Sequence, residues 1–235
     1  MNMTIHDDPV AVTVPASLAG KRVAVLGGTG PQGRGLARRF ALAGLEVVIG
    51  SRDGERAVAM AEELTAEIGG PVGGGENAAV AAGADIVLLV VPWDGHARLV
   101  KELAHVLAGK VVVDCVNPLS FGKHGCSPIL VEEGSAVEQA QMLLPDSVVV
   151  GAFNTISAVL LNDPEQGRID TDVLVVGDVR EATDLVQDLA ATIPGVRGIF
   201  AGRQFNAHQV EAFTANLISM NRRYKAHAGI RVTDI

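Results

Sequence analysis

Cysteine and aromatic side chains are scarce in this chain. Its 235 residues include two cysteines, Cys115 and Cys126, and a single tryptophan, and aromatic residues make up 3% of the total. The two cysteines show neither a C-x-x-C pair nor the spacing of metal ligands, so the sequence predicts no zinc site and no disulfide framework. We interpret both as reduced thiols, which favours a cytoplasmic protein.

The chain also lacks long hydrophobic runs and an excess of basic residues. No segment reaches the roughly 18 uninterrupted apolar residues that suggest a membrane-spanning helix. Residues 1–20 have neither a basic start nor a long apolar stretch, so we read them as a mobile N-terminal tail and not as a signal peptide. The formal net charge of -8 argues against non-specific binding to nucleic acid or to an anionic membrane. Small molecules are therefore the expected partners.

Residues 21–56 read as a strand, a glycine-rich turn, a helix and a second strand. Gly28, Gly30 and Gly33 have the spacing G-x-G-x-x-G directly after a short apolar run. In a dinucleotide-binding turn, the first glycine permits a tight turn, the second lets the backbone approach a pyrophosphate, and the third lets the helix lie close to the strand. Pro31 suits the first helical position, and the start of a helix favours an anion.

Taken alone, this spacing would be better explained as an ordinary glycine-rich turn, because glycine is common in the chain. Its context favours dinucleotide binding. An apolar strand precedes the turn, an amphipathic helix follows it, and a second strand comes at residues 46–49, all within the length of one βαβ unit. The sequence therefore predicts a dinucleotide site at this turn.

The tip of the second strand carries Ser51 and Arg52 where an acidic residue would hold the ribose of NAD. A guanidinium fork beside a hydroxyl binds a ribose 2′-phosphate, which a carboxylate would repel. Arg56 follows one helical turn later and adds a second cation. The pattern predicts NADP. In the alternative interpretation, both arginines are merely solvated and Asp53 only caps the next helix.

The rest of the chain alternates between apolar strands and helical segments, which predicts an α/β fold of the Rossmann type with a doubly wound, mostly parallel sheet. The last helix places apolar residues at three- and four-residue steps, which is typical of core or of an oligomer interface; they are Val210, Phe213, Leu217, Met220 and Tyr224. We expect strands at 85–91, 148–153, 172–176 and 198–201, helices at 55–68, 77–82, 136–143, 180–191 and 206–225, and a glycine-rich turn at 69–75.

Ligands of doubly wound sheets lie beyond the carboxyl ends of the strands. Residues 91–93 end the expected strand at 85–91, and residues 114–119 form the exit of the next strand along the chain, so we expect both segments to wall the nicotinamide half of the site. Trp93 would then be a wall of the pocket, although it could instead fill a gap in the core.

Several motifs together resemble those of the F420-dependent NADP reductases, in their actinobacterial form, over residues 21–233. The motifs are Val25-Leu26-Gly27-Gly28-Thr29-Gly30, Gly50-Ser51-Arg52, Val91-Pro92-Trp93, Asp114-Cys115-Val116-Asn117-Pro118 and the terminal segment 221–230. The resemblance implies an enzyme that transfers a hydride between NADP(H) and the deazaflavin coenzyme F420, from nicotinamide C4 to deazaflavin C5.

The same resemblance assigns the site residues. Those implied to contact NADP are Thr29, Gly30, Pro31 and Gln32 at the pyrophosphate, Ser51, Arg52 and Arg56 at the 2′-phosphate, and Trp93, Ala97, Leu119 and Ala158 along the groove. Gly28 and Gly33 belong to the predicted cofactor site through the glycine motif. Ala228 and Gly229 match backbone that meets the deazaflavin ring. Similar enzymes often carry a histidine at Asn154-Thr155, so a role for that histidine does not transfer here.

By resemblance, the chain forms a homodimer with an NADP-binding Rossmann domain at 21–153 and a smaller portion at 154–235 that completes the F420 pocket and the dimer interface. Direct hydride transfer demands no general acid or base and no metal, so we expect His96, His208 and His227 to be hydrogen-bonding or surface residues. A positive patch could hold the acidic tail of F420, or it could simply be solvated; it comprises Lys123, His124, Arg203, Arg222, Arg223 and Lys225.

Two other functions would share the NADP half of the site. An NADPH-dependent flavin or ferric reductase would differ in the second pocket. An NADP-sensing regulator would bind NADPH without turning it over, and it would need a partner surface where an enzyme has its second pocket. The terminal segment at 226–230 argues against the regulator.

Overall fold

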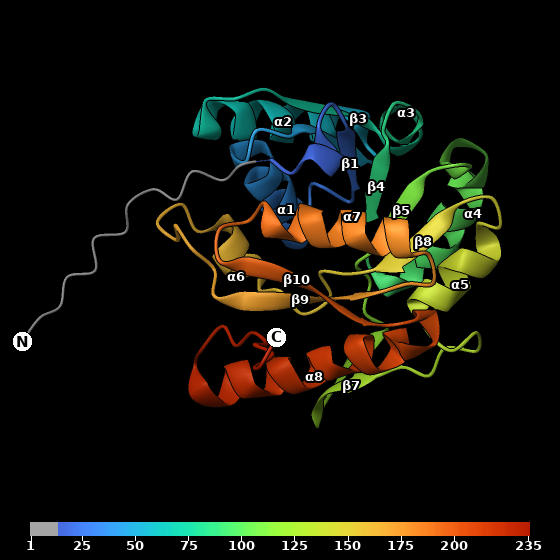
Figure 1. Ribbon diagram of the computed structural model, residues 1–235, viewed down its shortest axis with the longest axis vertical. Helices are drawn as coiled ribbons and strands as arrows, with labels where there is room; N and C mark the ends of the chain where they lie inside the picture. The colour runs from blue at the N-terminus through green and yellow to red at the C-terminus, as the bar shows by residue number, and fades with distance from the viewer. Residues whose placement is uncertain (1–13) are drawn as a thin grey trace, which may run out of the picture.

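The computed structural model describes residues 14–235, which form an eight-stranded sheet and a separate two-stranded hairpin (Figure 1). The large sheet has the order β10-β9-β8-β5-β4-β1-β2-β3. Its strands are β1 (Arg22–Leu26), β2 (Glu46–Ser51), β3 (Val72–Glu76), β4 (Ile86–Leu89), β5 (Val111–Asp114), β8 (Val148–Gly151), β9 (Thr171–Val176) and β10 (Val196–Gly202). The β8–β9 pair is antiparallel and all other neighbours are parallel, so the predicted mostly parallel sheet is confirmed.

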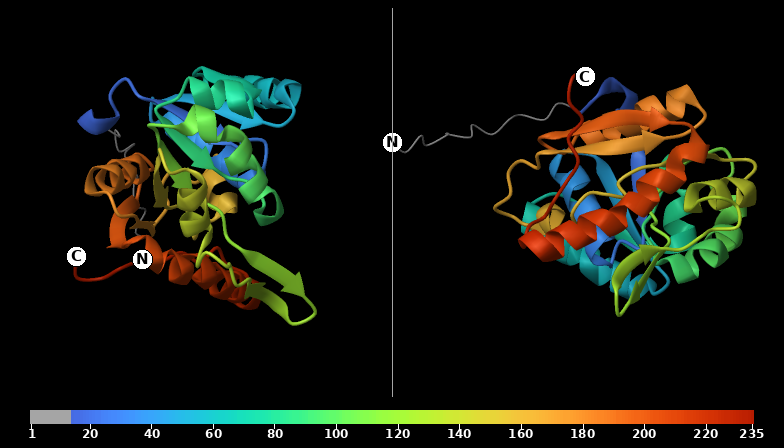
Figure 2. Two further views of the ribbon diagram at one scale, coloured as in Figure 1. Left: turned by 90° about the vertical axis from the view of Figure 1, so that its right-hand side faces the viewer. Right: turned by 90° about the horizontal axis from the view of Figure 1, so that it is seen from below.

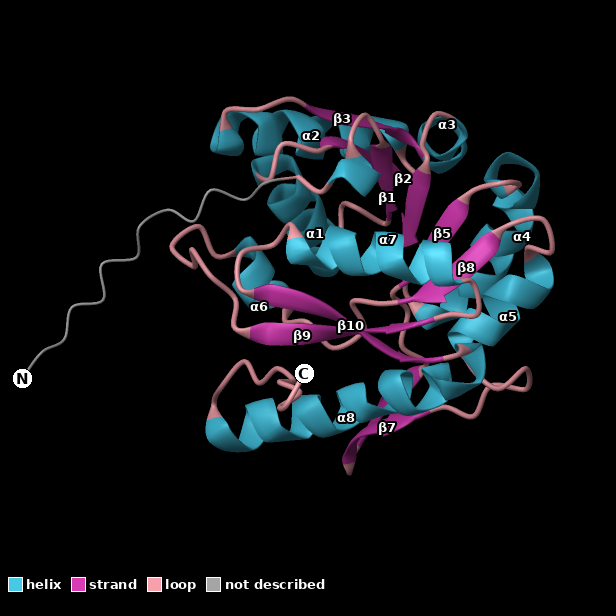
Figure 3. Cartoon of the chain, in the orientation of Figure 1, coloured by secondary structure: helices cyan, strands magenta, loops and turns pink. Residues whose placement is uncertain are grey.

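Helices cover both faces of this sheet (Figure 3). They are α1 (Pro31–Leu42), α2 (Gly54–Ile68), α3 (Asn77–Ala82), α4 (Trp93–Leu107), α5 (Ala136–Leu143), α6 (Ala158–Asn162), α7 (Arg180–Ala191) and α8 (Ala207–Tyr224). Side chains of α1, α2 and α7 bury one face, and those of α3, α4 and α5 bury the other. Among residues 14–235, no helix is both long and apolar enough to span a membrane.

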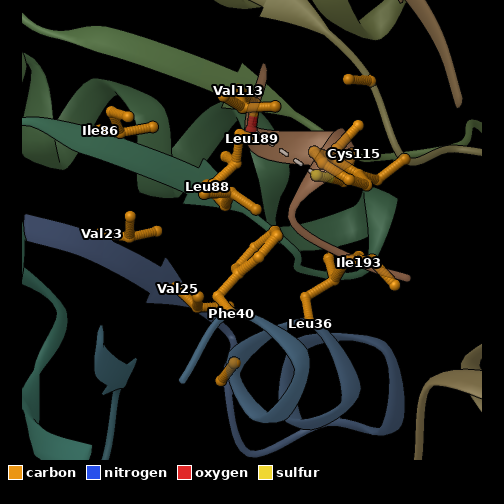
Figure 4. Packing of buried hydrophobic residues seen from close by; sticks show 14 of the residues in the cluster. Val23, Val25, Leu36, Phe40, Ile86, Leu88, Val113, Cys115, Leu189 and Ile193 are labelled. Carbon is orange, nitrogen blue, oxygen red and sulfur yellow. Dashed lines mark hydrogen bonds between the residues drawn. The ribbon is translucent and has the colours of Figure 1, made fainter. Parts of the chain in front are cut away.

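The two cores follow from the alternation of side chains along the strands. Val23 and Val25 of β1 belong to the core under α1, while Ala24 and Leu26 belong to the core under α3 and α4. In the first core, Phe40 of α1 points from its helix toward the strands (Figure 4). All strand positions of β4 are buried, as expected for a central parallel strand with helices on both sides.

The chain beyond β8 stays in contact with the first half. Strands β9 and β10 extend the same sheet, so the sheet runs across the boundary predicted between residues 153 and 154. Helix α8 then lies beside the hairpin of β6 (Leu119–Gly122) and β7 (Gly125–Pro128), which projects from the body (Figure 2). The last residues return to β9, where the Asp172 N–H donates to the Ile230 carbonyl at 2.6 Å.

Some expectations from the sequence were wrong. The glycine-rich segment 69–75 was expected to be a turn, but Val72–Glu76 is edge strand β3. Glycine has a low strand propensity, so the sequence of this segment does not indicate a strand. Close packing nevertheless requires glycine at Gly74, because a Cβ there would lie 2.4 Å from the Ala57 carbonyl oxygen of α2. The hairpin at 119–128 and helices α4 and α6 were not predicted.

The predicted mobile tail at 1–20 falls partly outside the described residues, which begin at 14. Within the described part, Ala16–Leu18 forms a turn of 3-10 helix. Leu18 is buried in the core that includes α7, so these residues are packed against the domain.

The apolar stripe of α8 divides between two environments. Val210 and Leu217 are buried. Phe213 and Met220 remain 39% and 40% exposed, and Tyr224 is 75% exposed. One half of the stripe is therefore core, and the other half forms an apolar surface along the helix.

Candidate functional site

The glycine-rich turn joins β1 to α1 at the carboxyl edge of the sheet, and each of its glycines has a distinct packing role. Gly27 has a φ of 82°, and a Cβ there would lie 2.1 Å from the Val90 carbonyl oxygen. A Cβ on Gly28 would meet Ile49 at 1.6 Å, and one on Gly33 would meet the Gly27 carbonyl oxygen at 2.5 Å. The tight-turn role expected for Gly28 therefore belongs to Gly27, whereas close helix packing at Gly33 is as the motif implies.

Gly30 is the glycine whose missing side chain faces open space. The nearest atom to a Cβ on it is the Gly27 carbonyl oxygen, at an ordinary 3.4 Å. Gly30 is also the N-cap of α1 and provides no side-chain cap, and Pro31 occupies the first turn. The backbone N–H groups at the start of α1 thus face the carboxyl edge of the sheet, where an anion would be stabilised.

Ser51, Arg52 and Arg56 lie beside this turn, at the tip of β2 and the start of α2. They line a cavity of about 530 Å³ together with Thr29 and Gly30. Neither guanidinium has a side-chain partner within residues 14–235, and both side chains are exposed. Asp53 does cap α2, accepting the Arg56 N–H at 3.1 Å, so the capping interpretation is right for the aspartate and leaves both arginine side chains free.

Several residues of this cavity had not been found from the sequence, among them Asn77, Arg98, Leu99 and Glu102. Asn77, at the start of α3, is 7% exposed, and its Oδ1 atom has no hydrogen-bond partner among the described residues. Arg98 of α4 lines the opposite wall. A buried amide without a partner is uncommon, which makes Asn77 a candidate contact for a bound ligand. Nothing in the local sequence distinguishes it from an ordinary helix-start asparagine.

A second cavity of about 550 Å³ continues from Gly30 toward α8. Of the predicted residues, Pro31, Gln32, Gly33, Trp93, Ala158 and Ala228 line it. The cavity is bounded by the loops that follow β1, β4, β5 and β8 and by α8. It therefore lies beyond the carboxyl ends of four strands, at the position where doubly wound sheets bind ligands.

Hydrogen bonds of amide side chains connect the segments that line the second cavity. Asn154 donates from Nδ2 to the Val116 carbonyl at 3.1 Å, and its own carbonyl accepts from Asn117 Nδ2 at 2.8 Å. Thr214 of α8 donates its hydroxyl to the same carbonyl at 3.1 Å. Asn154 thus joins the loops after β5 and β8 to α8, so its side chain has a structural role.

Four of the predicted cofactor-binding residues do not line either cavity: Gly28, Ala97, Leu119 and Gly229. Gly28 packs against Ile49, as described above, and Leu119 begins the β6–β7 hairpin. Gly229 lies against Thr171 of β9, where a Cβ would come within 2.3 Å of the hydroxyl. Ala228 does reach the second cavity, and its N–H donates to Asn221 Oδ1 at 2.6 Å.

The three histidines singled out from the sequence have different environments. His96 is buried, with Nε2 at 2.7 Å from Asp114 Oδ2, which agrees with a hydrogen-bonding role. His227 is exposed and borders the second cavity, and His208 is half-buried on α8. No group of metal-ligating side chains gathers anywhere in the described part of the chain.

A buried carboxylate of α8 also lies near His96. Glu211 accepts the backbone N–H groups of Ala136 and Val137 at 3.0 and 3.2 Å, at the start of α5. Burial raises the pKa of Glu211 to about 7, and the nearby Asp114 carboxylate adds to the shift, while the two backbone hydrogen bonds oppose it. From the sequence, Asp114 was expected in the wall of the nicotinamide site, but it is buried and lines neither cavity. No function had been expected for Glu211.

The positive patch expected for an acidic tail is spread over three elements. Lys123 and His124 form the turn of the β6–β7 hairpin, Arg203 follows β10, and Arg222, Arg223 and Lys225 lie at the end of α8. All six side chains are exposed.

The sheet order, the glycine turn at the carboxyl edge and the cleft beyond it define a protein of the Rossmann class. A family described as NADP oxidoreductase, coenzyme F420-dependent, matches residues 22–118. The F420-dependent NADP reductase of Methanothermobacter marburgensis is 40% identical over 222 residues, covering 91% of this chain and 99% of that protein. The reductase of the same name from Methanocaldococcus jannaschii is 36% identical with the same coverage. The chain belongs to the F420-dependent NADP reductase family.

A solved structure agrees with the sequence relatives. The crystal structure of a protein from Arthrobacter sp. FB24, described as a candidate F420-dependent NADP reductase, matches with a TM-score of 0.77 at 33% identity. The match covers 92% of this chain and 100% of that chain. The shared fold therefore includes β9, β10 and α8 as well as the glycine turn.

Proposed function

We propose that this protein is an oxidoreductase that transfers a hydride between NADP(H) and the deazaflavin coenzyme F420. The observation that carries the proposal is the continuous cleft, in which two unpaired guanidinium groups lie at one end, the glycine turn lies in the middle, and a mostly apolar chamber closed by α8 lies at the other. Family membership supplies the identity of the two cofactors.

The first cavity has the residues that NADP(H) requires. Arg52 and Arg56 would hold the 2′-phosphate with Ser51, because their forks are free and no carboxylate occupies the strand tip. The pyrophosphate would lie against Gly30 and the start of α1, where a side chain is absent and N–H groups are available. Asn77 would supply a buried polar contact deeper in the same cavity.

The second cavity would bring the two reacting rings together. When bound, nicotinamide and deazaflavin supply the hydride chemistry themselves, between C4 of one and C5 of the other. The chain contributes walls from Trp93, Ala158 and Ala228, which would orient the rings and exclude water. The proton that the reduced deazaflavin takes up would come from solvent or a backbone group, so no side chain needs to act as general acid or base. The exposed cations of α8 and the hairpin turn would attract the acidic tail of F420.

We extend the proposal to the quaternary state and the cellular location. We infer a homodimer in which the exposed half of the α8 stripe contributes to the interface, because Phe213, Met220 and Tyr224 form an apolar surface. Both cysteines are free, which fits a reducing compartment such as the cytoplasm. The acidic net charge makes nucleic acid an unsuitable partner.

A side-by-side assay of NADPH oxidation with F420, FMN and FAD tests the function. We expect F420 to give the highest kcat/KM. A higher kcat/KM with FMN or FAD would establish a flavin reductase instead. Tight NADPH binding without turnover of any acceptor would favour a regulator that senses NADP. Adding a ferric chelate as a fourth acceptor tests the ferric reductase in the same experiment.

A further inference from the structure

His96 lies one turn into α4 and is completely buried, at 0% exposed. Both of its ring nitrogens face hydrogen-bond acceptors. Nε2 lies 2.7 Å from Asp114 Oδ2, and Nδ1 lies 3.0 Å from Gln139 Oε1. A neutral imidazole carries one N–H and one bare nitrogen, so it could satisfy only one of these contacts.

The orientation of the Gln139 amide is fixed by a second carboxylate. Gln139 donates from Nε2 to Glu133 Oε2 at 3.1 Å. If the amide were reversed, its oxygen would face the Glu133 carboxylate, and two acceptors would meet without a hydrogen between them. Gln139 therefore presents its oxygen to His96, and both ring nitrogens of His96 must carry hydrogens.

The polar and charged groups around His96 come from β5, from α5 and the loop before it, and from α8. Asp114 ends β5, Gln139 and Glu133 come from α5 and the loop before it, and Glu211 comes from α8. Burial disfavours the charged imidazole, but Asp114 and the hydrogen bonds outweigh it and raise the pKa of His96 above its ordinary value. The carboxylates that face the ring are thus arranged to hold a cation.

The His96 ring in turn supports a wall of the cleft. Trp93 precedes it by three residues on the first turn of α4, so the two side chains share a helix face. Their ring centroids are 5.5 Å apart and the planes differ by 25°, which is a stacked pair. Trp93 also lines the second cavity, whereas His96 does not. A cation stacked on an indole face is attracted by the negative π-face of the ring.

We propose that His96 is a positioning residue, held as an imidazolium by Asp114 and Gln139, on which Trp93 stacks so that the indole keeps a fixed place in the wall of the hydride-transfer chamber. The proposal rests on the proposed function only for the identity of that chamber. The charge of His96 and its contact with Trp93 can be measured without any acceptor.

The protonation of His96 is tested by long-range proton–nitrogen NMR of the ¹⁵N-histidine-labelled protein. At about pH 7.5, an imidazole with the ordinary pKa of about 6.5 is mostly neutral. We expect both His96 nitrogens to give shifts of the protonated type at this pH. The His96→Gln variant assigns the signals by their loss. One bare and one protonated nitrogen in the wild-type spectrum would overturn the proposal.

The link to Trp93 is tested by fluorescence, since the chain has a single tryptophan. A stacked imidazolium quenches indole emission, so we expect emission to rise in His96→Gln and in Asp114→Asn. The matched control is His105→Gln, which makes the same change at an exposed position of the same helix and should leave emission unchanged. Unchanged emission in both test variants would overturn the proposal.

If His96 positions Trp93, disturbing His96 should lower the rate of hydride transfer without changing the affinity for NADPH. We expect Asp114→Asn to lower kcat with F420 by about tenfold or more, because a small displacement at a reacting ring can cost roughly a hundredfold. The dissociation constant of NADPH should change by less than about threefold, because the contacts at Arg52 and Arg56 are untouched. An unchanged kcat would contradict the positioning role. If the wild-type protein fails to reduce F420, the proposed function fails, and the NMR and fluorescence results still decide the state of His96.

Discussion

At the scale of single residues, we propose that the free guanidinium groups select NADP over NAD. Arg52 and Arg56 lie at the tip of β2 without a side-chain partner among residues 14–235, and a 2′-phosphate is the part of NADP that could pair with them. If either guanidinium group already formed an ion pair, its hydrogen-bond donors would not be available to a ligand. Their availability is therefore evidence for the ligand and carries no structural role.

The Arg52→Ala variant should weaken NADPH binding by about 1.5–3 kcal/mol, the usual contribution of a hydrogen bond to a charged group. NADH binding should hardly change, because NADH has no 2′-phosphate. Isothermal titration of both nucleotides measures this. Arg180→Ala is the control, since Arg180 is an exposed side chain on α7 that pairs with Asp184. Equal losses for the two nucleotides would rule out the assignment.

Glu211 should make the stability of the protein depend on pH. Its folded-state pKa is raised to about 7 from 4.5, so the folded protein binds a proton more tightly than the unfolded chain. The free energy of unfolding should therefore fall as pH rises from about 4.5 to about 7, by roughly 3 kcal/mol from this residue. Urea unfolding at pH 5 and pH 8 measures the change. The Glu211→Gln variant should show a smaller decrease, and an equal decrease would assign the effect to other groups.

At the scale of elements, the glycine turn shows how sequence and packing act together. Gly33 lets α1 begin directly over the turn, because a Cβ there would approach the Gly27 carbonyl oxygen to 2.5 Å. The opposing atom belongs to the backbone and cannot move aside as a side-chain tip can. The position of the helix start, and hence of its free N–H groups, depends on this contact.

The Gly33→Ala variant should displace the turn from α1. We expect a loss of about 1–3 kcal/mol in the free energy of unfolding, typical of an overpacked site, and at least about a tenfold loss in NADPH affinity. Gly70→Ala is the control, because a Cβ there meets no atom within 4 Å and Gly70 does not have a positive φ. If both variants bound NADPH like the wild type, Gly33 would not set the phosphate site.

The sequence alone was sufficient to predict the elements whose hydrophobic pattern lies within the element itself. The apolar runs of β1 and β4 and the amphipathic pattern of α7 predicted their own conformation. It was insufficient for β3, because three of its five residues are glycines and the strand is specified by the close approach of α2. The hairpin at 119–128 has exposed polar positions without a clear alternation, so only tertiary contact with α8 defines it.

The candidate site likewise contains residues that the sequence predicted and residues that it did not. The glycine turn and the arginines at the strand tip could be predicted, because their spacing lies between an apolar strand, a helix and a second strand. Asn77, Glu211 and the buried contact of Asp114 with His96 could not, because a buried polar residue is recognised by its surroundings and those come from distant segments. Gly229 matched the family motif, yet it packs on Thr171, since the terminal segment returns to β9.

At the scale of the whole molecule, the exposed half of the α8 stripe predicts self-association. Sedimentation should show two chains at micromolar concentration. Met220→Lys should shift the protein toward monomer, because a charge would be buried in the interface. Val58→Lys is the control, an exposed apolar position of similar accessibility on α2. A wild-type protein that is monomeric and fully active would show that the stripe has no partner.

The central claim is that the whole cleft exists to bring two rings together for direct hydride transfer. The most direct measurement uses NADPH carrying deuterium at C4 of the nicotinamide, on the transferred face, with F420 as acceptor. The account predicts that nearly all of the label appears at C5 of the reduced deazaflavin, because the chamber excludes water and no side chain relays the hydride. Label lost to solvent, or no reduction of F420 at all, would contradict it.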